Sequence, residues 1–397
     1  MDILFLGNGF DLHHKLPTSY FDFLSVVQFL NDYYNDSMVN VAQVFGDERL
    51  QHKNKSIETS YDYYEVFYKE VNIDKIVIEE LIKKSKSNIW FKYLSKSLEK
   101  NLTWIDFEKE IYKVIIAFDE FFLLNGHSIK DENERTAYIV SQFAFFVKKG
   151  EEDYCNWFWN AEDLKTEYVQ ELPVGSGLLE IDKDEIIKDL YEALRELADM
   201  LKMYLRIFVD GLLKQIKKFN FAFKNFDYQR ANYVCTFNYT NTYELLYEPV
   251  SSIAHIHGTI DKNIVLGVNP DEFDDLENID TSFVYFKKYF QRVFYRTDIE
   301  YLKLIEEMKL TPANKDVKTV YVVGHSLDKT DEDVIKQVFA LANKIKIFYH
   351  EEYAMGKLIN NLVSIYGKAG LDELREKKGL EFLFHQPAKR YQLEFCV

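Results

Sequence analysis

The chain opens on a short apolar run that ends in glycine. Residues Ile3 to Leu6 are all apolar, and Gly7-Asn8-Gly9 follows them directly. An unbroken apolar run of this length is typical of a strand that a parallel sheet buries on both faces. The two glycines suit a backbone that approaches a bound phosphate closely, and they suit equally a tight strand-to-helix turn without a ligand. The run constrains the chain to an α/β fold whose first loop is a candidate binding site.

Three later segments repeat this pattern of an apolar run that ends in small or polar residues. They cover residues 231–244, 253–258 and 317–327. In an open parallel sheet, ligands bind in the crevice outside the carboxyl ends of the strands. We therefore expect the ends of these segments to meet the first glycine turn at one site.

Polar side chains stand where these strands should end. The Asn238 amide can orient a ribose hydroxyl or an attacking water, although Asn is also a common turn residue. His257 has the residue type of a general base, with an ordinary pKa near about 6.5, although a single histidine is often structural. His255 lies one step further from the strand end and is expected to support the core. Asp331 or Asp333 is placed either to favour a helix dipole or to meet ribose hydroxyls.

The opening residues resemble a known family. Gly7-Asn8-Gly9-Phe10-Asp11, followed by Leu16-Pro17-Thr18-Ser19-Tyr20, is similar to the opening signature of the AbiH bacteriophage abortive-infection proteins. Trp104-Ile105-Asp106-Phe107-Glu108 is similar to a second segment of that family. The resemblance implies a role in defence against phage, with a phage-derived trigger among the partners.

The same landmarks resemble the sirtuin-like NAD-binding fold. The sirtuin pattern G-A-G-x-S-x-x-x-G-I-P-x-F-R lies over residues 7–20 without a gap. It matches at Gly7, Gly9 and Pro17, and it departs at Asp11, Lys15 and Tyr20. The sirtuin T-x-N-x-D, H-G and G-T-S-L resemble Thr236-Phe237-Asn238-Tyr239-Thr240, His257-Gly258 and Gly324-His325-Ser326-Leu327.

This second resemblance implies a Rossmann-type parallel sheet that binds NAD and hydrolyses the bond between nicotinamide and ribose. Because the pyridinium is already a good leaving group, water is a sufficient nucleophile. The implied catalytic residues are Asn238 and His257. Asp11, which stands in place of the sirtuin serine, is a third catalytic candidate, because its carboxylate could bind the ribose or stabilise positive charge on it. The implied nucleotide-binding residues are Gly7, Asn8, Gly9, Phe10, Thr236, Gly324 and Ser326, with backbone N–H groups of residues 7–10 holding the pyrophosphate.

Two other classes of function fit the same pattern. The first is a non-catalytic sensor of NAD or of an ADP-ribose-type nucleotide. The second is a toxin that acts on nucleic acid. A formal net charge of -16 argues against nucleic acid and against an anionic membrane surface as partners, because both carry negative charge.

Between the first and second strands the sequence has helical periodicity. Thr18 or Ser19 is expected to cap the first helix. Asp106 and Glu108 open a later helix, where acids either favour the helix dipole or reach toward the pocket. The clearest apolar stripe runs over residues 182–219 and predicts one helix of roughly 55 Å.

The predicted fold class is therefore α/β, a sirtuin-like Rossmann-type parallel sheet with a large all-helical insertion. Residues 1–24 and 228–397 would form the discontinuous nucleotide-binding domain, and residues 25–227 the insertion. The long amphipathic helix favours a homo-oligomer formed through the insertion.

Cysteine usage and hydropathy predict the compartment. Three cysteines among 397 residues are too few for a disulfide framework or for the four-cysteine zinc site of sirtuins, so we expect a reducing cytoplasm and no metal. The sequence contains no apolar stretch of about 18 residues and no leader, which predicts a soluble protein.

Overall fold

A six-stranded parallel sheet organises the protein. The computed structural model describes residues 2–99, 106–122, 127–128, 169–171, 178–216, 231–247, 252–268, 281–310 and 318–384. Within them the strands are β1 (Asp2–Leu6), β5 (Tyr233–Thr236), β6 (Ser252–His255), β7 (Thr319–Val323), β8 (Lys344–Tyr349) and β9 (Glu381–Phe384). They lie in the order β6-β5-β1-β7-β8-β9, and every pairing is parallel. The predicted parallel α/β sheet is confirmed.

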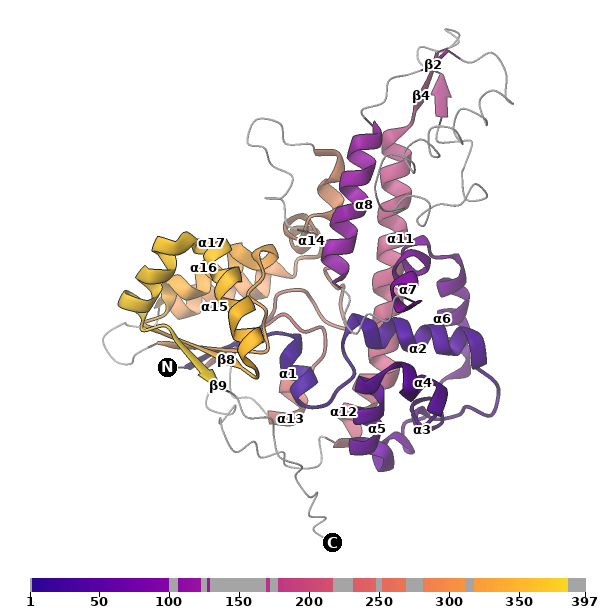
Figure 1. Ribbon diagram of the computed structural model, residues 1–397, viewed down its shortest axis with the longest axis horizontal. Helices are drawn as coiled ribbons and strands as arrows, with labels where there is room; N and C mark the ends of the chain where they lie inside the picture. The colour runs from indigo at the N-terminus through magenta and orange to yellow at the C-terminus, as the bar shows by residue number, and fades with distance from the viewer. Residues whose placement is uncertain are drawn as a thin grey trace.

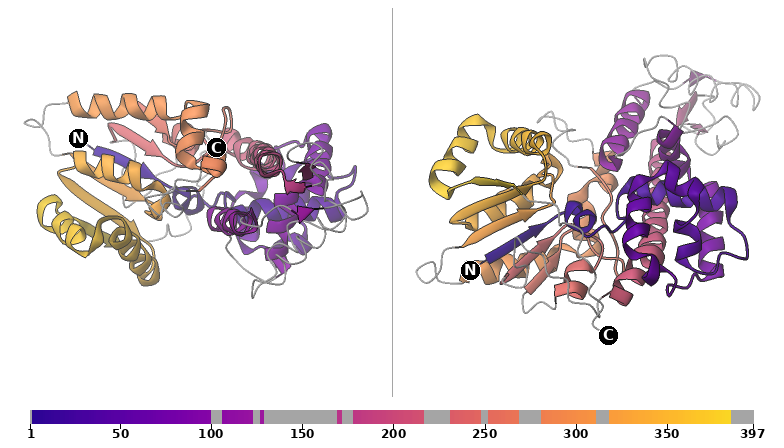
Figure 2. Two further views of the ribbon diagram at one scale, coloured as in Figure 1. Left: turned by 90° about the horizontal axis from the view of Figure 1, so that it is seen from above. Right: turned by 60° about the horizontal axis from the view of Figure 1, so that its bottom comes forward.

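The direction in which the sheet grows reverses at β1. From β1 the chain adds β5 and then β6 on one side, and it returns to the other side of β1 with β7, β8 and β9. Leu6 pairs with Thr236 on one side and with Val323 on the other, so the carboxyl ends of three strands lie together. Both views in Figure 2 show β1 running toward the helical part of the molecule.

The two faces of β1 belong to two different cores. Leu4 and Leu6 lie in a core that extends into the helical insertion. Ile3 and Phe5 lie in the other core, which packs under α15 (Asp298–Leu310), α16 (Glu332–Leu341) and α17 (Glu352–Lys378). Because both faces of the strand are buried, its sequence contains no polar residue between Ile3 and Leu6.

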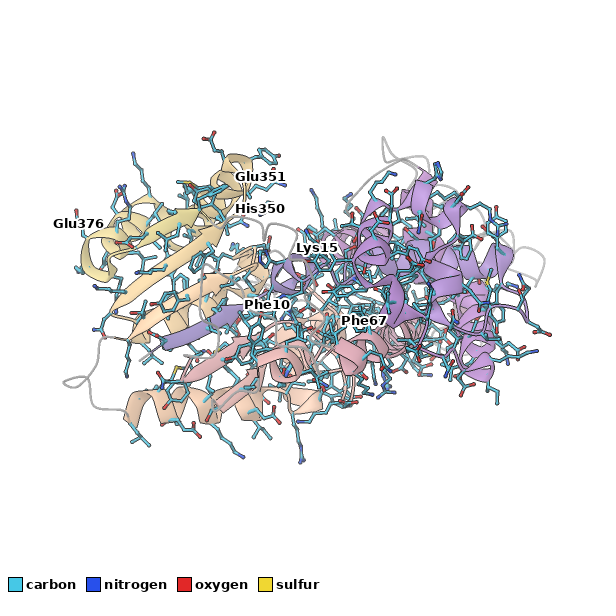
Figure 3. The ribbon with its side chains drawn as sticks, turned by 90° about the horizontal axis from the view of Figure 1, so that it is seen from below. Phe10, Lys15, Phe67, His350, Glu351 and Glu376 are labelled. Atoms are coloured by element: carbon cyan, nitrogen blue, oxygen red, sulfur yellow. The ribbon has the colours of Figure 1, made fainter. Side chains whose placement is uncertain are left out.

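Helices between β1 and β5 form most of the insertion, on the right of Figure 1. Ser19 caps the first long helix through a capping box with Asp22, as predicted for Thr18 or Ser19. Phe10, at the sheet, and Phe67, in the insertion, are labelled in Figure 3 and belong to one continuous core. The helices are α1 (Asn8–His13), α2 (Tyr20–Tyr33), α3 (Val41–Phe45), α4 (Glu48–Lys53), α5 (Lys55–Tyr68), α6 (Lys75–Ser87), α7 (Ile89–Glu99), α8 (Phe107–Phe122), α11 (Lys183–Tyr204) and α12 (Gly211–Ile216).

The prediction of an all-helical insertion is wrong. A small antiparallel sheet joins β2 (His127–Ser128), β4 (Leu178–Ile181) and β3 (Val169–Glu171) in that order. Strands of two to four residues are too short for a period of two to be distinguished from a helical pattern.

The long predicted helix is divided by a π-helical segment. α11 passes into Leu205–Asp210, which is π-helical, and then into α12; residues 217–219 lie outside the described part. Its apolar stripe is buried within this chain, where α11 contacts α2, α6 and α7. The homo-oligomer stays a prediction. The apolar stripe of α11 does not support it, because that stripe is already buried within the chain.

The remaining described elements all follow β5 in the chain. They are α13 (Thr242–Tyr247), the short 3-10 segments Thr281–Phe286 and Lys329–Asp331, and α14 (Lys288–Tyr295). Among the described residues, none of the helices is both long enough and apolar enough to pass through a lipid bilayer.

Candidate functional site

A cavity of about 300 Å³ lies at the carboxyl ends of β1, β5, β6 and β7. It is also lined by Asp106 and Glu108 at the start of α8, and by Leu205 of the π-helical segment. The sheet and the insertion thus both contribute to its wall. Eight of the ten predicted site residues line it, namely Gly7, Asn8, Gly9, Asp11, Asn238, His257, Gly324 and Ser326.

The structure does not bring the other two predicted residues, Phe10 and Thr236, to the cavity. The Phe10 side chain is buried in the core beside His14. The Thr236 hydroxyl accepts a hydrogen bond of 3.2 Å from the N–H of Asn238. Thr236 therefore shapes the strand end that carries Asn238, and Phe10 anchors α1 to the core.

Glycine in the first loop is required by contact between two loops. A Cβ atom at Gly7 would lie 2.5 Å from Cα of His325, and one at Gly9 would lie 2.7 Å from Cα of Gly324. Gly324 itself has a φ of +67°, a conformation that residues with a side chain rarely adopt. The β1–α1 loop, by which we mean residues 7–10 including the first turn of α1, therefore packs backbone against backbone on the loop after β7.

This contact also uses the N–H groups that were expected to hold a pyrophosphate. Gly7 N–H donates to the Val323 carbonyl at 3.1 Å, Gly9 N–H to Gly324 at 2.8 Å, and Phe10 N–H to Gly7 at 2.8 Å. Three of the four N–H groups that the resemblance assigned to the pyrophosphate therefore already have a partner within the protein.

Asp11 and Asn238 present buried acceptor atoms that have no partner. Thr240 donates a hydrogen bond of 2.5 Å to Oδ2 of Asp11, but Oδ1 of Asp11 and Oδ1 of Asn238 are buried and unpaired among the described residues. Burial raises the pKa of Asp11 to about 6, and the polar side chains of Thr240, Thr242 and Asn238 oppose this rise. Unpaired buried acceptors are costly, and both residues line the cavity.

His257 is held by a carboxylate. Its Nε2 lies 3.0 Å from Oδ1 of Asp331, and both side chains are buried. Burial, assisted by the nearby charge of Lys288, lowers the pKa of His257 to about 4, so the ring is neutral at neutral pH. With the Nε2 proton donated to Asp331, the lone pair of the neutral ring lies on Nδ1.

Asp331 is the centre of a buried ionic network. Lys288 Nζ lies 3.1 Å from Oδ1 of Asp331 and 2.8 Å from Oε1 of Glu108. Although burial opposes ionisation, Lys288 and His257 hold the pKa of Asp331 well below its ordinary value. Burial raises the pKa of Glu108 to about 7, against the favourable charge of Lys288.

Two further histidines support the strand ends. His325 accepts the N–H of Leu327 at Nδ1, at 2.8 Å, so its Nε2 carries the proton and faces Oδ2 of Asp331 at 3.5 Å. His255, predicted to support the core, is buried with Nε2 at 2.6 Å from Glu244 and Nδ1 at 3.1 Å from the Asn238 carbonyl. His255 thus fixes the backbone that carries Asn238.

Both interpretations of the Asp106 and Glu108 pair apply. Asp106 Oδ1 accepts the N–H of Lys109 at 3.1 Å and so caps α8, and its side chain lines the cavity as well. Glu108 also lines the cavity, and its Oε1 contacts Lys288, which is not part of the lining. Phe107, the residue between the two acids in the sequence, stacks on Tyr20 with ring centroids 4.0 Å apart.

Lys288 is the site residue that sequence reasoning missed. On α14, the polar residues Lys288, Gln291 and Arg292 are buried, whereas Tyr289 and Phe294 are exposed. A standard amphipathic reading places the polar stripe in solvent, so no local signal identifies this lysine. Among the described residues, no group of three or more His, Cys, Asp or Glu side chains is arranged to hold a metal ion.

Comparison with known proteins gives one match. The sequence model of a family described as "Bacteriophage abortive infection AbiH" matches residues 3–350. Neither the curated proteins nor the solved structures gave a match.

Proposed function

The chain belongs to the AbiH family of bacteriophage abortive-infection proteins, and we propose that it is an effector that hydrolyses NAD between nicotinamide and ribose. Counted along the sheet, the strand order is 3-2-1-4-5-6, which is the order of dinucleotide-binding sheets of the Rossmann type. The cavity lies where this order reverses, which is where such sheets bind their ligands. The topology therefore supports a nucleotide as the ligand, within the sirtuin-like fold that the motifs resemble.

The observation that carries the proposal is the pair of unpaired acceptors, Oδ1 of Asp11 and Oδ1 of Asn238. Asn238 follows the end of β5, and Asp11 lies in α1 after the neighbouring strand β1, so both reach one cavity. A ribose offers two adjacent hydroxyl donors, which would satisfy two such acceptors. The carboxylate form of Asp11 would also stabilise the positive charge that develops on the ribose as the bond breaks.

The remaining step needs a base for water. In the proposed reaction the bond between C1' of the ribose and the pyridinium nitrogen breaks, and its electron pair leaves with neutral nicotinamide. A water oxygen bonds to C1', and His257 Nδ1 accepts the proton of that water. Asp331 holds the ring through Nε2, so the products are nicotinamide, ADP-ribose and one proton.

The test is to incubate the purified protein with NAD and to measure the release of nicotinamide by chromatography. We expect the wild type to release nicotinamide, and Asn238→Ala and His257→Ala each to be slower by about 100-fold or more. A matched control is Asn35→Ala, because Asn35 is an exposed side chain outside the cavity.

The same experiment separates the enzyme from a sensor. If no nicotinamide is released but calorimetry detects NAD binding that Asn238→Ala weakens, the protein is a nucleotide sensor and the hydrolase proposal is wrong. Parallel assays in extract of phage-infected cells would supply a trigger. Absence of release there as well would exclude an enzyme that only waits for activation.

A further inference from the structure

We propose that the cavity recognises the nicotinamide riboside half of its substrate and leaves the phosphates outside. On this basis the free riboside, the mononucleotide and the dinucleotides NAD and NADP are all substrates. The inference rests on the proposed function, because it names the part of the substrate that the same site holds.

The first support is the backbone of the β1–α1 loop. Loops that bind the phosphates of a nucleotide do so with N–H groups that have no partner in the protein. Here the N–H groups of Gly7, Gly9 and Phe10 already donate to carbonyl groups of the protein. α1 is also only six residues long, so it offers little helix dipole to an anion.

The second support is the charge of the cavity wall. Its described lining contains the carboxyl groups of Asp11, Asp106, Glu108, Asp328 and Asp331, and it contains neither Lys nor Arg. Lys288 lies behind this lining with Nζ bound to two of the carboxylates. A wall of this kind repels phosphate and attracts a cationic pyridinium ring.

The third support is the hydrogen-bonding character of the two unpaired groups. Oδ1 of Asn238 can only accept a hydrogen bond, and the ionised carboxylate of Asp11 can only accept as well. Phosphate oxygens at neutral pH are acceptors, so a phosphate cannot satisfy these atoms, whereas ribose hydroxyls can. The cavity volume of about 300 Å³ is at the lower limit for small-molecule sites, which favours half of a dinucleotide.

The first experiment compares kcat/KM for nicotinamide riboside, nicotinamide mononucleotide, NAD and NADP, with nicotinamide release as the readout. We expect the four values to agree within about tenfold, because each substrate presents the same half to the site. Cleavage of NAD with a riboside value lower by more than about 100-fold would overturn this inference and leave the proposed function intact. Cleavage of none of the four would overturn the proposed function itself.

Salt provides a test that needs no mutation. Raising ionic strength from 0.01 to 0.15 M shortens the screening length from about 30 to about 8 Å. If carboxylates repel the phosphates, screening favours the phosphorylated substrate, and the ratio of kcat/KM for NAD to that for the riboside should rise several-fold. A ratio that falls with salt would mean that positive groups hold the phosphates, and the inference would be wrong.

Two charge-removing variants test the wall directly. Asp106 and Asp328 each accept a backbone N–H through Oδ1, so Asp106→Asn and Asp328→Asn keep an acceptor oxygen while removing the charge. We expect the ratio of NAD to riboside to rise by about twofold to tenfold in either variant. The matched control is Asp199→Asn, whose side chain is 61% exposed on α11 and does not line the cavity. Ratios equal to that of the control in both variants would refute the electrostatic repulsion on which the inference depends.

Discussion

At the scale of single residues, the contact between His257 and Asp331 decides which ring nitrogen is free. We expect Asp331→Asn to reduce kcat for nicotinamide release by about 100-fold to 10,000-fold with little change in KM. The reason is that an amide that donates to Nε2 favours the wrong tautomer and leaves Nδ1 protonated. Steady-state kinetics with NAD, measured over a range of pH, provides the check.

The control for this variant is Asp199→Asn, which alters an exposed carboxylate outside the cavity lining. Circular dichroism should show that both variants fold. If Asp331→Asn kept the wild-type kcat and pH profile, Asp331 would be a structural ion-pair partner of Lys288 and not a positioning residue for His257.

Asp11 gives a dependence of stability on pH. Its pKa rises from 3.8 in the unfolded chain to about 6 in the folded protein. Between these values the folded state keeps a proton that the unfolded state loses, so this group costs stability as pH rises from about 4 to about 6 and the full cost persists above. Asp11→Asn should therefore gain up to about 3 kcal/mol relative to wild type at pH 8 and nothing below pH 4.

Urea denaturation of both proteins at several pH values measures this difference. Taking the difference cancels the titration of groups that the two proteins share. A constant difference across pH 4 to 8 would mean that Asp11 has no raised pKa. Because Asp11 is also proposed to stabilise charge on the ribose, the stabilised variant should release nicotinamide more slowly.

At the scale of elements, the contact between the β1–α1 loop and the loop after β7 is sensitive to one added methyl group. Gly9→Ala would bring Cβ within 2.7 Å of Cα of Gly324, and the three nearest atoms that it would meet all belong to the backbone. We expect a loss of about 1 to 3 kcal/mol in the free energy of unfolding. The control is Gly356→Ala in α17, where a Cβ meets nothing within 4 Å, and which should be neutral or stabilising by up to about 1 kcal/mol. Equal effects of the two substitutions in urea denaturation would contradict the tight loop contact.

How well the sequence predicts each element depends on how its faces are buried. β1 could be predicted because both of its faces are in a core. β2 to β4 could not, because each is too short to show a period. α14 could be predicted as helical but not oriented, since it buries its polar side and exposes Tyr289 and Phe294.

At the scale of the whole molecule, an ion pair joins the insertion to the segment between β6 and β7. Glu108 belongs to α8 of the insertion, and Lys288 belongs to α14. We expect Lys288→Met to cost about 3 to 5 kcal/mol, because two carboxylates lose their buried counter-charge. Adding Glu108→Gln to Lys288→Met should recover part of that loss, since one unpaired charge is removed.

A double-mutant cycle in urea measures this coupling. Strict additivity of the two single variants would contradict the pairing of Glu108 with Lys288. Besides this ion pair, one continuous apolar core joins β1 to the insertion. The predicted division into two domains, residues 1–24 with 228–397 and residues 25–227, stays a prediction. Residues of both parts contribute to this one core.

The candidate site could be predicted in part for a topological reason. Parallel strands end at one edge, so Asn238, His257 and Gly324 were expected to meet, and they do. The network of Glu108, Lys288 and Asp331 could not be predicted, because its members are separated by 180 and 43 positions and follow no local spacing. Such groups are brought together only by the tertiary fold.

The backbone contact between the two glycine loops has a consequence for motion. Those loops form the floor of the cavity, and hydrogen bonds from Gly7 and Gly9 join them across the reversal of strand order. A floor fastened in this way cannot act as a hinge. Asp106 and Glu108, at the start of α8, line the same cavity. We therefore expect substrate entry and product exit to depend on displacement of this part of the wall, so that the insertion, and not the sheet, would set the speed of turnover.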